Sequence, residues 1–504
     1  MGNDSLGHSR GELCTKAASA DRWERTCVIL LPRRPGWRLF MDTQDCQDNQ
    51  LAQVVELFTT LIDQRQAQEE REPVSPAVPP EKLLQELPLG LPEEGLPFDE
   101  VAERLRAVVE ATPSTAPSRF YNQLFGGREP FAVLGDVLAT ALNNSMYTFK
   151  VAGPQVLLEN GLIERMGNLM GYEHHEGTFT PGGSLSNLCA MLLARDYACP
   201  DFRERGMDGS RLRVYTSVDS HYSVPKAAAI LGVGRQNVVR IPVDECGRML
   251  ARALASAIDA DVKAGYVPLM VNATAGTTVL GAFDPITELA DVCKPRDVWL
   301  HVDGSFGASM VFDERFEVCF EGSERADSIA WDAHKLMGVP LTCSVLLVRE
   351  RGRLKASFDE AAGYLFQTED DQWNPGTRSI QCGRRNDALK LWTNWLHHGT
   401  AGYRARTERM RDLALLAAEC VRESPGMELV KEPESLTVCF TVEGGSSESL
   451  CDSLQETGRA MVGHAMVEGV SVVRLALVDP GTHEDEVRRF FEDVRYVMSR
   501  QASA

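Results

Sequence analysis

The sequence has little positive charge for its length. It contains 52 Lys and Arg residues against 72 Asp and Glu residues, which gives a formal net charge of −20 at pH 7. A chain of this sign offers no extended positive surface for DNA or RNA, and an anionic membrane surface repels it. We therefore expect no nucleic-acid partner and no membrane partner, although a few local cations can still bind an acidic ligand.

Long apolar runs and paired cysteines are also missing. No stretch approaches the roughly 18 to 20 apolar residues that a membrane helix needs, and the N-terminus lacks the basic and then apolar layout of a secretory signal. The 13 cysteines form no CxxC pair and no Cys/His cluster at zinc spacing. This pattern predicts free thiols, no metal site and a cytoplasmic protein, because thiols stay reduced in the cytoplasm.

The chain is nevertheless long and apolar enough to bury a large core. Its 504 residues, 43% of them hydrophobic, allow about two to four domains. Residues 1–40 show little pattern and are expected to form a disordered extension. Residues 41–117 are expected to form a helical and proline-rich arm, followed by a large domain over 118–395 and a small C-terminal domain over 396–504.

The arm and the C-terminal part both contain helical patterns. Apolar periodicity predicts helices over 41–71 and 98–111, whereas the prolines of 72–97 are typical of a linker or an extended segment. Near the C-terminus, a helical pattern covers 401–424. Two apolar runs and a final helix follow it, as in an α+β domain, and the runs lie at 436–442 and 470–478.

Short apolar runs alternate with helical segments in the large domain. The runs are rich in Val, Ile, Leu and Tyr, and one of the helices between them is expected at 285–293. This alternation predicts a mostly parallel sheet with helices on both faces, and a ligand site beyond the carboxyl ends of the strands. The predicted strands are 212–217, 238–241, 267–272, 298–303, 328–331 and 342–348.

The first polar motif could hold an anion. Glycines, serines and an asparagine at 180–187 precede a helical run over 188–197. The N–H groups at the start of a helix, together with nearby hydroxyl groups, suit a phosphate. A glycine turn with a serine N-cap explains the same residues without any ligand.

Two further motifs follow predicted strands. His221 comes directly after the strand at 212–217, where a histidine can stack on a planar cofactor or move protons, although a single histidine often has a structural role. Thr278 closes the segment 272–278, whose small residues let a ligand approach the backbone. Neither motif decides a function alone.

Two ionisable residues complete the set. Asp303 ends an apolar strand, and burying its carboxylate is costly unless a cation or a strong donor, such as a protonated pyridine nitrogen, faces it. Lys335 follows another strand, and a lysine that is desolvated there can form a Schiff base. A solvated lysine is the alternative interpretation.

Together these features meet the requirements of pyridoxal 5′-phosphate. The ordered motifs PGGSLSN, DSHYS, NATAGTTVLGAFDP, WLHVDGSFG and WDAHK resemble those of the group II pyridoxal-phosphate decarboxylases. The later AGYLFQ and QCGRR resemble the glutamate and cysteine sulfinate branch. The resemblance covers about residue 118 to the C-terminus. It implies the α/β fold type I of the PLP-dependent transferases, similar to aspartate aminotransferase, and a homodimer with its site at the subunit interface.

The resemblance also implies a role for each motif. Lys335 would hold the cofactor as a Schiff base, Asp303 would keep the pyridine nitrogen protonated, and His221 would stack on the ring. The remaining cofactor contacts divide between the phosphate and the ring. Those expected at the phosphate are Ser184, the Leu185 amide and His334, and those expected along the ring are Thr278 and Ser305.

The same resemblance implies four substrate-binding residues. Gln123 matches a residue that contacts the distal acidic group, and Arg474 matches the arginine that receives a carboxylate. Phe125 and Ser145 resemble the cysteine sulfinate and acidic amino acid decarboxylases, and the bulk of Phe125 should shorten the pocket. The expected reaction is α-decarboxylation of L-aspartate to β-alanine or of L-cysteine sulfinate to hypotaurine.

Three departures from the family pattern keep other functions open. Asp332 stands near the expected phosphate, Ser305 replaces an apolar contact, and the loop 367–378 offers only Trp373 where the glutamate branch has a proton-donating tyrosine. The alternatives are glutamate decarboxylation to GABA, oxidative deamination or transamination, and a non-catalytic binding protein with the same fold. Transamination and deamination would follow from the missing tyrosine, and loss of catalysis from Asp332 and Ser305.

Overall fold

The computed structural model describes residues 44–71, 74–75, 77–116, 119–206, 209–360 and 373–501. The extension predicted over 1–40 lies outside these residues, and so does the part of the predicted loop before Trp373. The contacts of the chain divide it into residues 1–60 and residues 61–504. Each unit is described by itself, and the functional residues all lie in the second.

The N-terminal region is mainly helical. α1 spans Gln44–Arg71 and α3 spans Phe98–Ala111, which confirms both predicted helices. The interpretation of 72–97 as a linker without a helix is wrong over seven residues, because α2 forms at Pro80–Glu86. Pro80 occupies the first turn of α2, where the N–H group that proline lacks has no partner within the helix.

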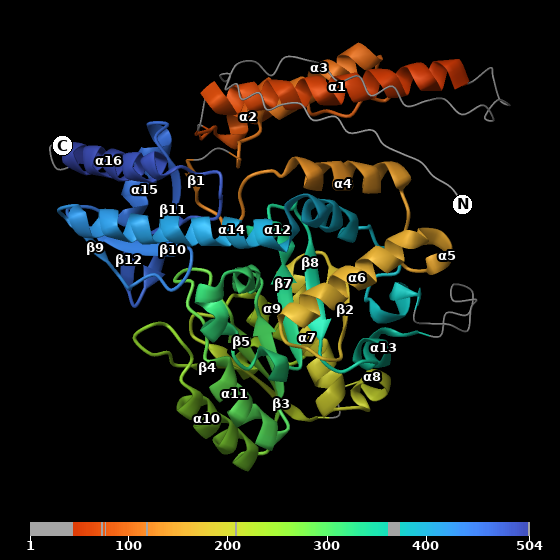
Figure 1. The fold of residues 1–504 in the computed structure, drawn as a ribbon, viewed down its shortest axis with the longest axis vertical. Helices are drawn as coiled ribbons and strands as arrows, with labels where there is room; N and C mark the ends of the chain where they lie inside the picture. The colour runs from red at the N-terminus through yellow and green to blue at the C-terminus, as the bar shows by residue number, and fades with distance from the viewer. Residues whose placement is uncertain are drawn as a thin grey trace, which may run out of the picture. The chain divides into compact units, whose positions relative to one another are not determined.

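The large domain is built on a seven-stranded sheet in the order β2-β8-β7-β6-β5-β3-β4 (Figure 1). Parallel pairs join β4, β3, β5, β6 and β7, whereas β8 runs antiparallel to both β7 and β2. The predicted mostly parallel sheet is therefore confirmed. Its strands are β2 (Glu176–Thr180), β3 (Arg211–Ser217), β4 (Val238–Ile241), β5 (Tyr266–Thr274), β6 (Trp299–Asp303), β7 (Ser328–Asp332) and β8 (Ser344–Val348).

Helices cover both faces of this sheet. Alternate strand residues point to opposite sides, and the apolar side chains on each side are buried against helices. Val271, Leu300 and Ile329 belong to one core cluster, and Met270 and Leu346 belong to another. The helices on the first face are α6 (Pro154–Leu169), α10 (Ala251–Lys263), α11 (Ile286–Cys293) and α14 (Ala388–Glu423). The helices on the second face are α7 (Gly183–Ala198) and α9 (Ser223–Ile230).

A second sheet forms the C-terminal part, with strand order β1-β11-β12-β10-β9. Its first strand comes from far upstream, because β1 pairs in parallel with β11. In Figure 1 the strands β9 to β12 lie together with α15 (Ser447–Glu456) and α16 (Glu484–Gln501). The strands are β1 (Phe120–Tyr121), β9 (Met427–Leu429), β10 (Thr437–Val442), β11 (Met461–Val467) and β12 (Val470–Ala476).

The long helix α14 links the two sheets. It packs on the large-domain core through Leu391 and Tyr403, and on the C-terminal core through Leu413 and Val421. Its backbone leaves the helical conformation at Gly399, where φ is 63°. The domain boundary expected between residues 395 and 396 thus falls within α14, a few residues before this break.

Candidate active site

A cavity of about 420 Å³ lies beyond the carboxyl ends of the parallel strands, where the fold predicts a ligand site. Side chains from β6, the residues after β3 and β7, and the start of α7 converge on it. Ten of the predicted site residues line this cavity, namely Gln123, Phe125, Ser184, His221, Thr278, Asp303, Ser305, His334, Lys335 and Arg474.

Asp303, the last residue of β6, supplies a buried negative charge. Its side chain accepts hydrogen bonds from Asn187 Nδ2 at 2.7 Å and from the Ser305 N–H group at 3.2 Å. Burial alone would raise the pKa of Asp303, but Ser305, the positive charge of Lys335 and the Asn187 hydrogen bond keep this pKa below its ordinary value. Asp303 therefore faces the cavity as a carboxylate that favours a protonated partner.

The start of α7 forms a cradle for an anion. Gly182 precedes the helix with φ 106°, which favours glycine, and Gly183 is its first residue. A Cβ atom at Gly183 would collide with Ser305 Oγ and lie 2.7 Å from Asp332 Oδ2. Glycine at 183 therefore lets the start of α7 lie close to Ser305 and Asp332, and the first helical turn, whose N–H groups favour an anion, lines the cavity.

Ser305 presents a hydroxyl group to this cradle. Its Oγ atom is buried, and across the described ranges of the chain it has no hydrogen-bond partner. A buried hydroxyl group without a partner is unfavourable. A polar ligand in the cavity would remove this cost.

Lys335 and Asp332 face each other at the floor of the cavity. Lys335 lies in the short helix α12 (Ala333–Leu336), and its Nζ atom is 3.6 Å from Asp332 Oδ2. His334 Nε2 lies 3.7 Å from the same oxygen, and Ser344 Oγ donates to Asp332 Oδ1 at 2.6 Å. The carboxylate that departs from the family pattern is therefore turned toward a cation.

His221 follows β3 and precedes α9. Its Nδ1 atom accepts a hydrogen bond from the Ser223 N–H group at 3.2 Å, so the neutral ring carries its proton on Nε2. Burial lowers the pKa of His221, which favours this neutral form. The adjacent Tyr222 ring, with its centroid 4.1 Å away, also lines the cavity.

Arg474 projects into the cavity from β12. Its Nη1 atom donates to the Thr278 carbonyl at 3.0 Å and its Nη2 atom donates to the Asn122 carbonyl, whereas its Nε atom has no partner in the described part of the chain. Burial lowers the pKa of Arg474, but a guanidinium keeps its charge at neutral pH. No carboxylate among the described residues forms an ion pair with it, so it can receive an anionic ligand.

Two predicted site residues are not brought to this cavity. Ser145 does not line it, and its Oγ atom accepts a hydrogen bond from the Arg384 N–H group at 3.2 Å. Leu185 does not line it either, and its N–H group donates to the Gly182 carbonyl at 2.9 Å. Sequence reasoning missed Asn187 and Tyr222 as site residues, although both stand inside the motifs that identified their neighbours.

One protein family matches most of the chain. The model of the pyridoxal-dependent decarboxylase conserved domain matches residues 80–443. The chain belongs to the pyridoxal-dependent decarboxylase family. The resemblance seen in the sequence is thereby confirmed, together with fold type I, pyridoxal phosphate as cofactor and amino acid decarboxylation as the class of reaction.

Individual decarboxylases agree with this assignment. The chain is 40% identical to mouse cysteine sulfinic acid decarboxylase over 366 residues, which covers 72% of this chain and 74% of that protein. It is 39% identical to human acidic amino acid decarboxylase GADL1 over 367 residues, with 72% and 70% coverage. The crystal structure of mouse CSAD matches with a TM-score of 0.83 and 33% identity, covering 88% of this chain and 99% of that one.

A further similar structure was solved with the cofactor bound. Oryza sativa TDC with PLP and tryptamine has a TM-score of 0.83 and 27% identity, and the match covers 93% of this chain and 99% of that chain. The cavity of the present decarboxylase fits this cofactor. Its cradle at Gly183 and the unpartnered Ser305 hydroxyl suit a phosphate, and the buried carboxylate of Asp303 suits a protonated ring nitrogen.

Across the residues that the structure describes, no group of three or more His, Cys, Asp and Glu side chains is arranged to hold a metal ion. No helix in those parts of the chain is both long and apolar enough to cross a bilayer.

Proposed function

We propose that this decarboxylase removes the α-carboxyl group of a short acidic L-amino acid, converting L-aspartate to β-alanine or L-cysteine sulfinate to hypotaurine. The observation that carries the proposal is Arg474, a half-buried cation without a carboxylate partner among the described residues, in the same cavity as Lys335 and Asp303. The relatives named for acidic amino acids and for cysteine sulfinic acid support it. A panel of acidic amino acids with identification of each product tests it.

The size of the cavity supports an acid with a short side chain. Phe125 lines the cavity together with Gln123, and its ring reduces the space available for a longer substrate. One extra methylene group in such a pocket changes kcat/KM by about 10- to 200-fold. We therefore rank aspartate and cysteine sulfinate above glutamate, which remains the nearest alternative substrate.

The cofactor and the residues of the chain have different roles in the proposed reaction. When bound, the cofactor supplies a protonated pyridine ring that withdraws electrons from the substrate Cα atom. Lys335 Nζ is the amine that would hold the cofactor. Asp303 would favour a protonated ring nitrogen, and Arg474 would bind a carboxylate of the substrate.

Proton return to the substrate is assigned to His221. Its Nε2 atom carries the proton, because Nδ1 accepts from the Ser223 N–H group, and the predicted loop contains no tyrosine at 367–378. General acid catalysis contributes about 100- to 10,000-fold to a rate. Slow protonation would favour the second candidate function, oxidative deamination or transamination, for which the missing tyrosine is the specific observation.

Replacing His221 with Phe is expected to slow amine formation by about 100-fold and to raise the share of carbonyl products, because stacking remains while the Nε2 proton is lost. Product analysis of the amine and the carbonyl compound measures this change. The visible absorbance of the lysine-bound cofactor serves as the control and should be retained. An unchanged rate and product ratio would show that His221 is not the donor.

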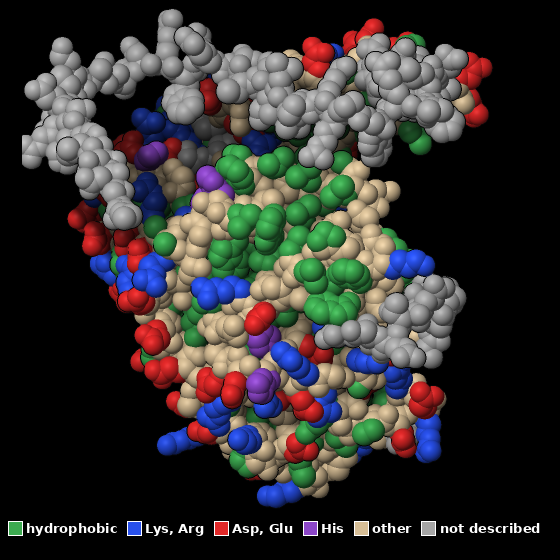
Figure 2. All heavy atoms as spheres, turned by 45° about the vertical axis from the view of Figure 1, so that its right-hand side comes forward, with side chains coloured by type: hydrophobic (Ala, Val, Ile, Leu, Met, Phe, Trp, Pro, Cys, Tyr) green, Lys and Arg blue, Asp and Glu red, His purple; other side chains and the backbone are tan. Residues whose placement is uncertain are grey.

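We also propose that two copies of the chain form a homodimer through an apolar face. Figure 2 shows apolar side chains gathered on one side of the molecule. Ser145 lies between α4 (Pro130–Leu142) and α5 (Phe149–Ala152), which both contribute to this face, so the site residue missing from the cavity would lie at the interface. The helices α4, α14, α6 and α5 pack in sequence on one another, and the exposed apolar residues that they carry, with Trp373 beside Phe149, are Phe131, Leu134, Val137, Leu138, Leu142, Phe149, Val151, Leu157, Trp392 and Leu396.

Replacing Leu134 with Glu is expected to convert the dimer to a monomer, because the new charge would be buried at the interface without a partner. Sedimentation equilibrium of the purified holoenzyme measures the mass. Val318→Glu is the control, since Val318 is also apolar and exposed but lies in the segment Glu314–Phe320, outside the helices of the proposed face. Wild-type protein that sediments as a monomer would contradict the proposed homodimer.

The proposed location rests on the cysteines. No disulfide joins the ten cysteines whose side chains the structure describes. Free thiols are typical of a reducing compartment, so we retain the cytoplasm as the proposed location. Fractionation of cells that express the full chain tests it.

A further inference from the structure

A row of buried polar side chains leads away from Asp303 along the sheet. Trp299, His301 and Asp303 alternate along β6 and therefore point to the same face, which α7 covers. Asn187 from α7 and Ser328 from β7 connect them. The distances are 2.7 Å from Asn187 Nδ2 to Asp303 Oδ2, 3.0 Å from His301 Nε2 to Asn187 Oδ1, 2.9 Å from His301 Nδ1 to Ser328 Oγ, and 2.9 Å from Trp299 Nε1 to Ser328 Oγ.

The direction of each hydrogen bond follows from the atoms available. Asn187 must turn its Nδ2 atom to Asp303, because its oxygen would otherwise face a carboxylate. Its two N–H groups are then both used, since Nδ2 also donates to Ser223 Oγ at 2.9 Å. The oxygen Oδ1 can only accept, so His301 must donate to it from Nε2.

His301 transmits this constraint to the next residues. Burial lowers the pKa of His301 to about 4, so the ring is neutral and carries only the Nε2 proton. Its Nδ1 atom is then an acceptor, and Ser328 must donate its hydroxyl proton to it. Trp299 Nε1 can only donate, and it donates to Ser328 Oγ. Every link therefore donates toward Asp303.

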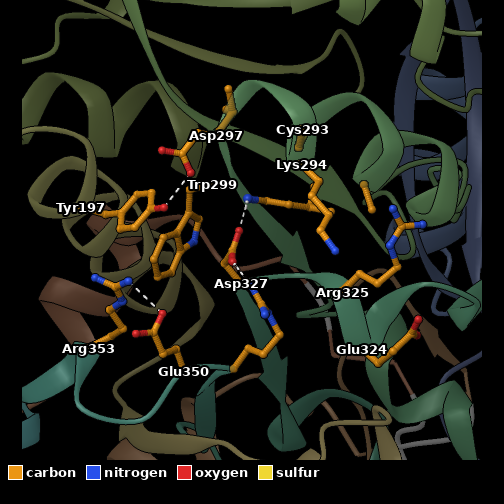
Figure 3. A pocket seen from close by; sticks show the side chains of 14 residues that line it. Tyr197, Cys293, Lys294, Asp297, Trp299, Glu324, Arg325, Asp327, Glu350 and Arg353 are labelled. Atoms are coloured by element: carbon orange, nitrogen blue, oxygen red, sulfur yellow. Dashed lines mark hydrogen bonds and ion pairs between the residues drawn. The ribbon is translucent and has the colours of Figure 1, made fainter.

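The relay, which consists of Trp299, Ser328, His301 and Asn187, runs along β6 to its amino end. Figure 3 shows Trp299 at this end, beside Tyr197 and Asp327, where it lines a second cavity of about 230 Å³. All four relay residues are at most 4% exposed. Water cannot replace a lost hydrogen bond easily at such positions, and successive bonds in one direction strengthen one another.

We propose that the relay is a positioning device for the cofactor, in which His301 fixes the Asn187 amide so that its N–H group stabilises the Asp303 carboxylate. A carboxylate held in this form leaves the shared proton on the pyridine nitrogen. Without the relay, the Asn187 amide is free to turn, and the proton moves from the ring nitrogen to Asp303. The proposal concerns the cofactor of the family and does not depend on which amino acid is the substrate.

The tautomer of His301 tests the relay in the unmodified protein. Nitrogen-15 NMR correlation spectra of labelled protein, recorded with and without cofactor, distinguish the two neutral forms of the ring. We expect the Nε2-protonated neutral form in both samples at neutral pH. A ring protonated on Nδ1, or on both nitrogens, would overturn the proposal, because His301 would then not direct Ser328 or would not be neutral.

Substitutions test the effect of the relay on the cofactor. The nitrogen-15 shift of labelled cofactor bound to the holoenzyme reports whether the ring nitrogen is protonated. We expect His301→Phe to move this shift toward the unprotonated value, and His301→Gln, which keeps an N–H donor, to restore the wild-type value. Ser328→Ala should give a smaller shift in the same direction, which keeps the test available if His301→Phe does not fold.

A residue on the other face of β6 separates positioning from packing. Leu300 is buried in the first-face core, so Leu300→Ala is expected to lower stability and leave the ring nitrogen protonated. In the relay variants, kcat should fall by about tenfold, a loss of the size seen when outer hydrogen-bond partners of metal sites are removed, and KM should change little because the relay does not touch the substrate. Relay variants that keep a protonated ring and normal kcat would overturn the proposal.

Discussion

Replacing Arg474 with Gln is expected to lower kcat/KM for aspartate and for cysteine sulfinate by about 100-fold or more. The guanidinium is half-buried, its Nη atoms donate to the Thr278 and Asn122 carbonyls, and it lines the cavity without a carboxylate partner among the described residues. Removing one member of a buried charge pair costs on the order of 2 to 5 kcal/mol. Each 1.4 kcal/mol corresponds to about a tenfold change, so the expected loss lies well within measurement.

Two controls make this result specific. Arg474→Lys keeps the charge but loses the planar fork that binds a carboxylate through two hydrogen bonds, so it should recover part of the activity. The visible absorbance of the bound cofactor should be the same in both variants and in the wild type. If Arg474→Gln retained kcat/KM for both acids within about threefold, Arg474 would not bind the substrate carboxylate, because that interaction alone exceeds 2 kcal/mol.

Replacing Lys335 with Ala is expected to abolish turnover and the visible absorbance of the lysine-bound cofactor. Lys335 Nζ is the amine that forms the covalent link, and an alanine side chain offers no replacement. The substitution also removes the cation that lies 3.6 Å from Asp332 Oδ2. Asp332 is buried, so its carboxylate would then repel the phosphate at the cradle, and cofactor binding should weaken as well.

A double variant separates these two effects. Adding Asp332→Asn to Lys335→Ala removes the unpaired carboxylate and should strengthen cofactor binding by about tenfold relative to the single variant, which is about 1.4 kcal/mol. Equilibrium dialysis measures this binding, and carbon dioxide release should remain absent. Turnover by Lys335→Ala would contradict the role of the lysine. Equal cofactor binding by the single and double variants would contradict the effect of Asp332.

The sheet could be predicted where its strands are continuous apolar runs. β3, β5, β6, β7 and β8 lie largely buried between two helical layers, so most of their residues are apolar and the polar ones stand mainly at the strand ends. β2 was missed because Glu176–Thr180 contains a glycine and three polar residues, although the whole strand is buried. β11 was missed because Gly463 and His464 interrupt its apolar pattern, and alternate residues face solvent.

The site could be predicted to the extent that it depends on strand ends. Asp303, His221 and Lys335 meet because the carboxyl ends of parallel strands lie at one edge of the sheet. The position of Leu185 depends instead on where α7 begins. The apolar pattern indicates a start at residue 188, but the helix starts at Gly183, so the Leu185 N–H group falls in the first turn and bonds to Gly182.

Hydrogen bonds between residues far apart in the chain could not be predicted from the sequence. Ser145 bonds to the backbone of Arg384, which is 239 residues away, and no local pattern indicates this contact. The pairing of Asp332 with Lys335 could have been predicted from the sequence, because residues three apart in a helix share a face. Asp332 directly precedes α12, and Lys335 lies within it.

The most direct test of the proposed function is a substrate panel on the purified holoenzyme, with carbon dioxide release and product identity measured for aspartate, cysteine sulfinate, glutamate and an aromatic amino acid. We expect β-alanine or hypotaurine as the main product, with a kcat/KM for its substrate at least about tenfold above that for glutamate. A main product of GABA, an aromatic amine or a carbonyl compound would contradict the proposed function.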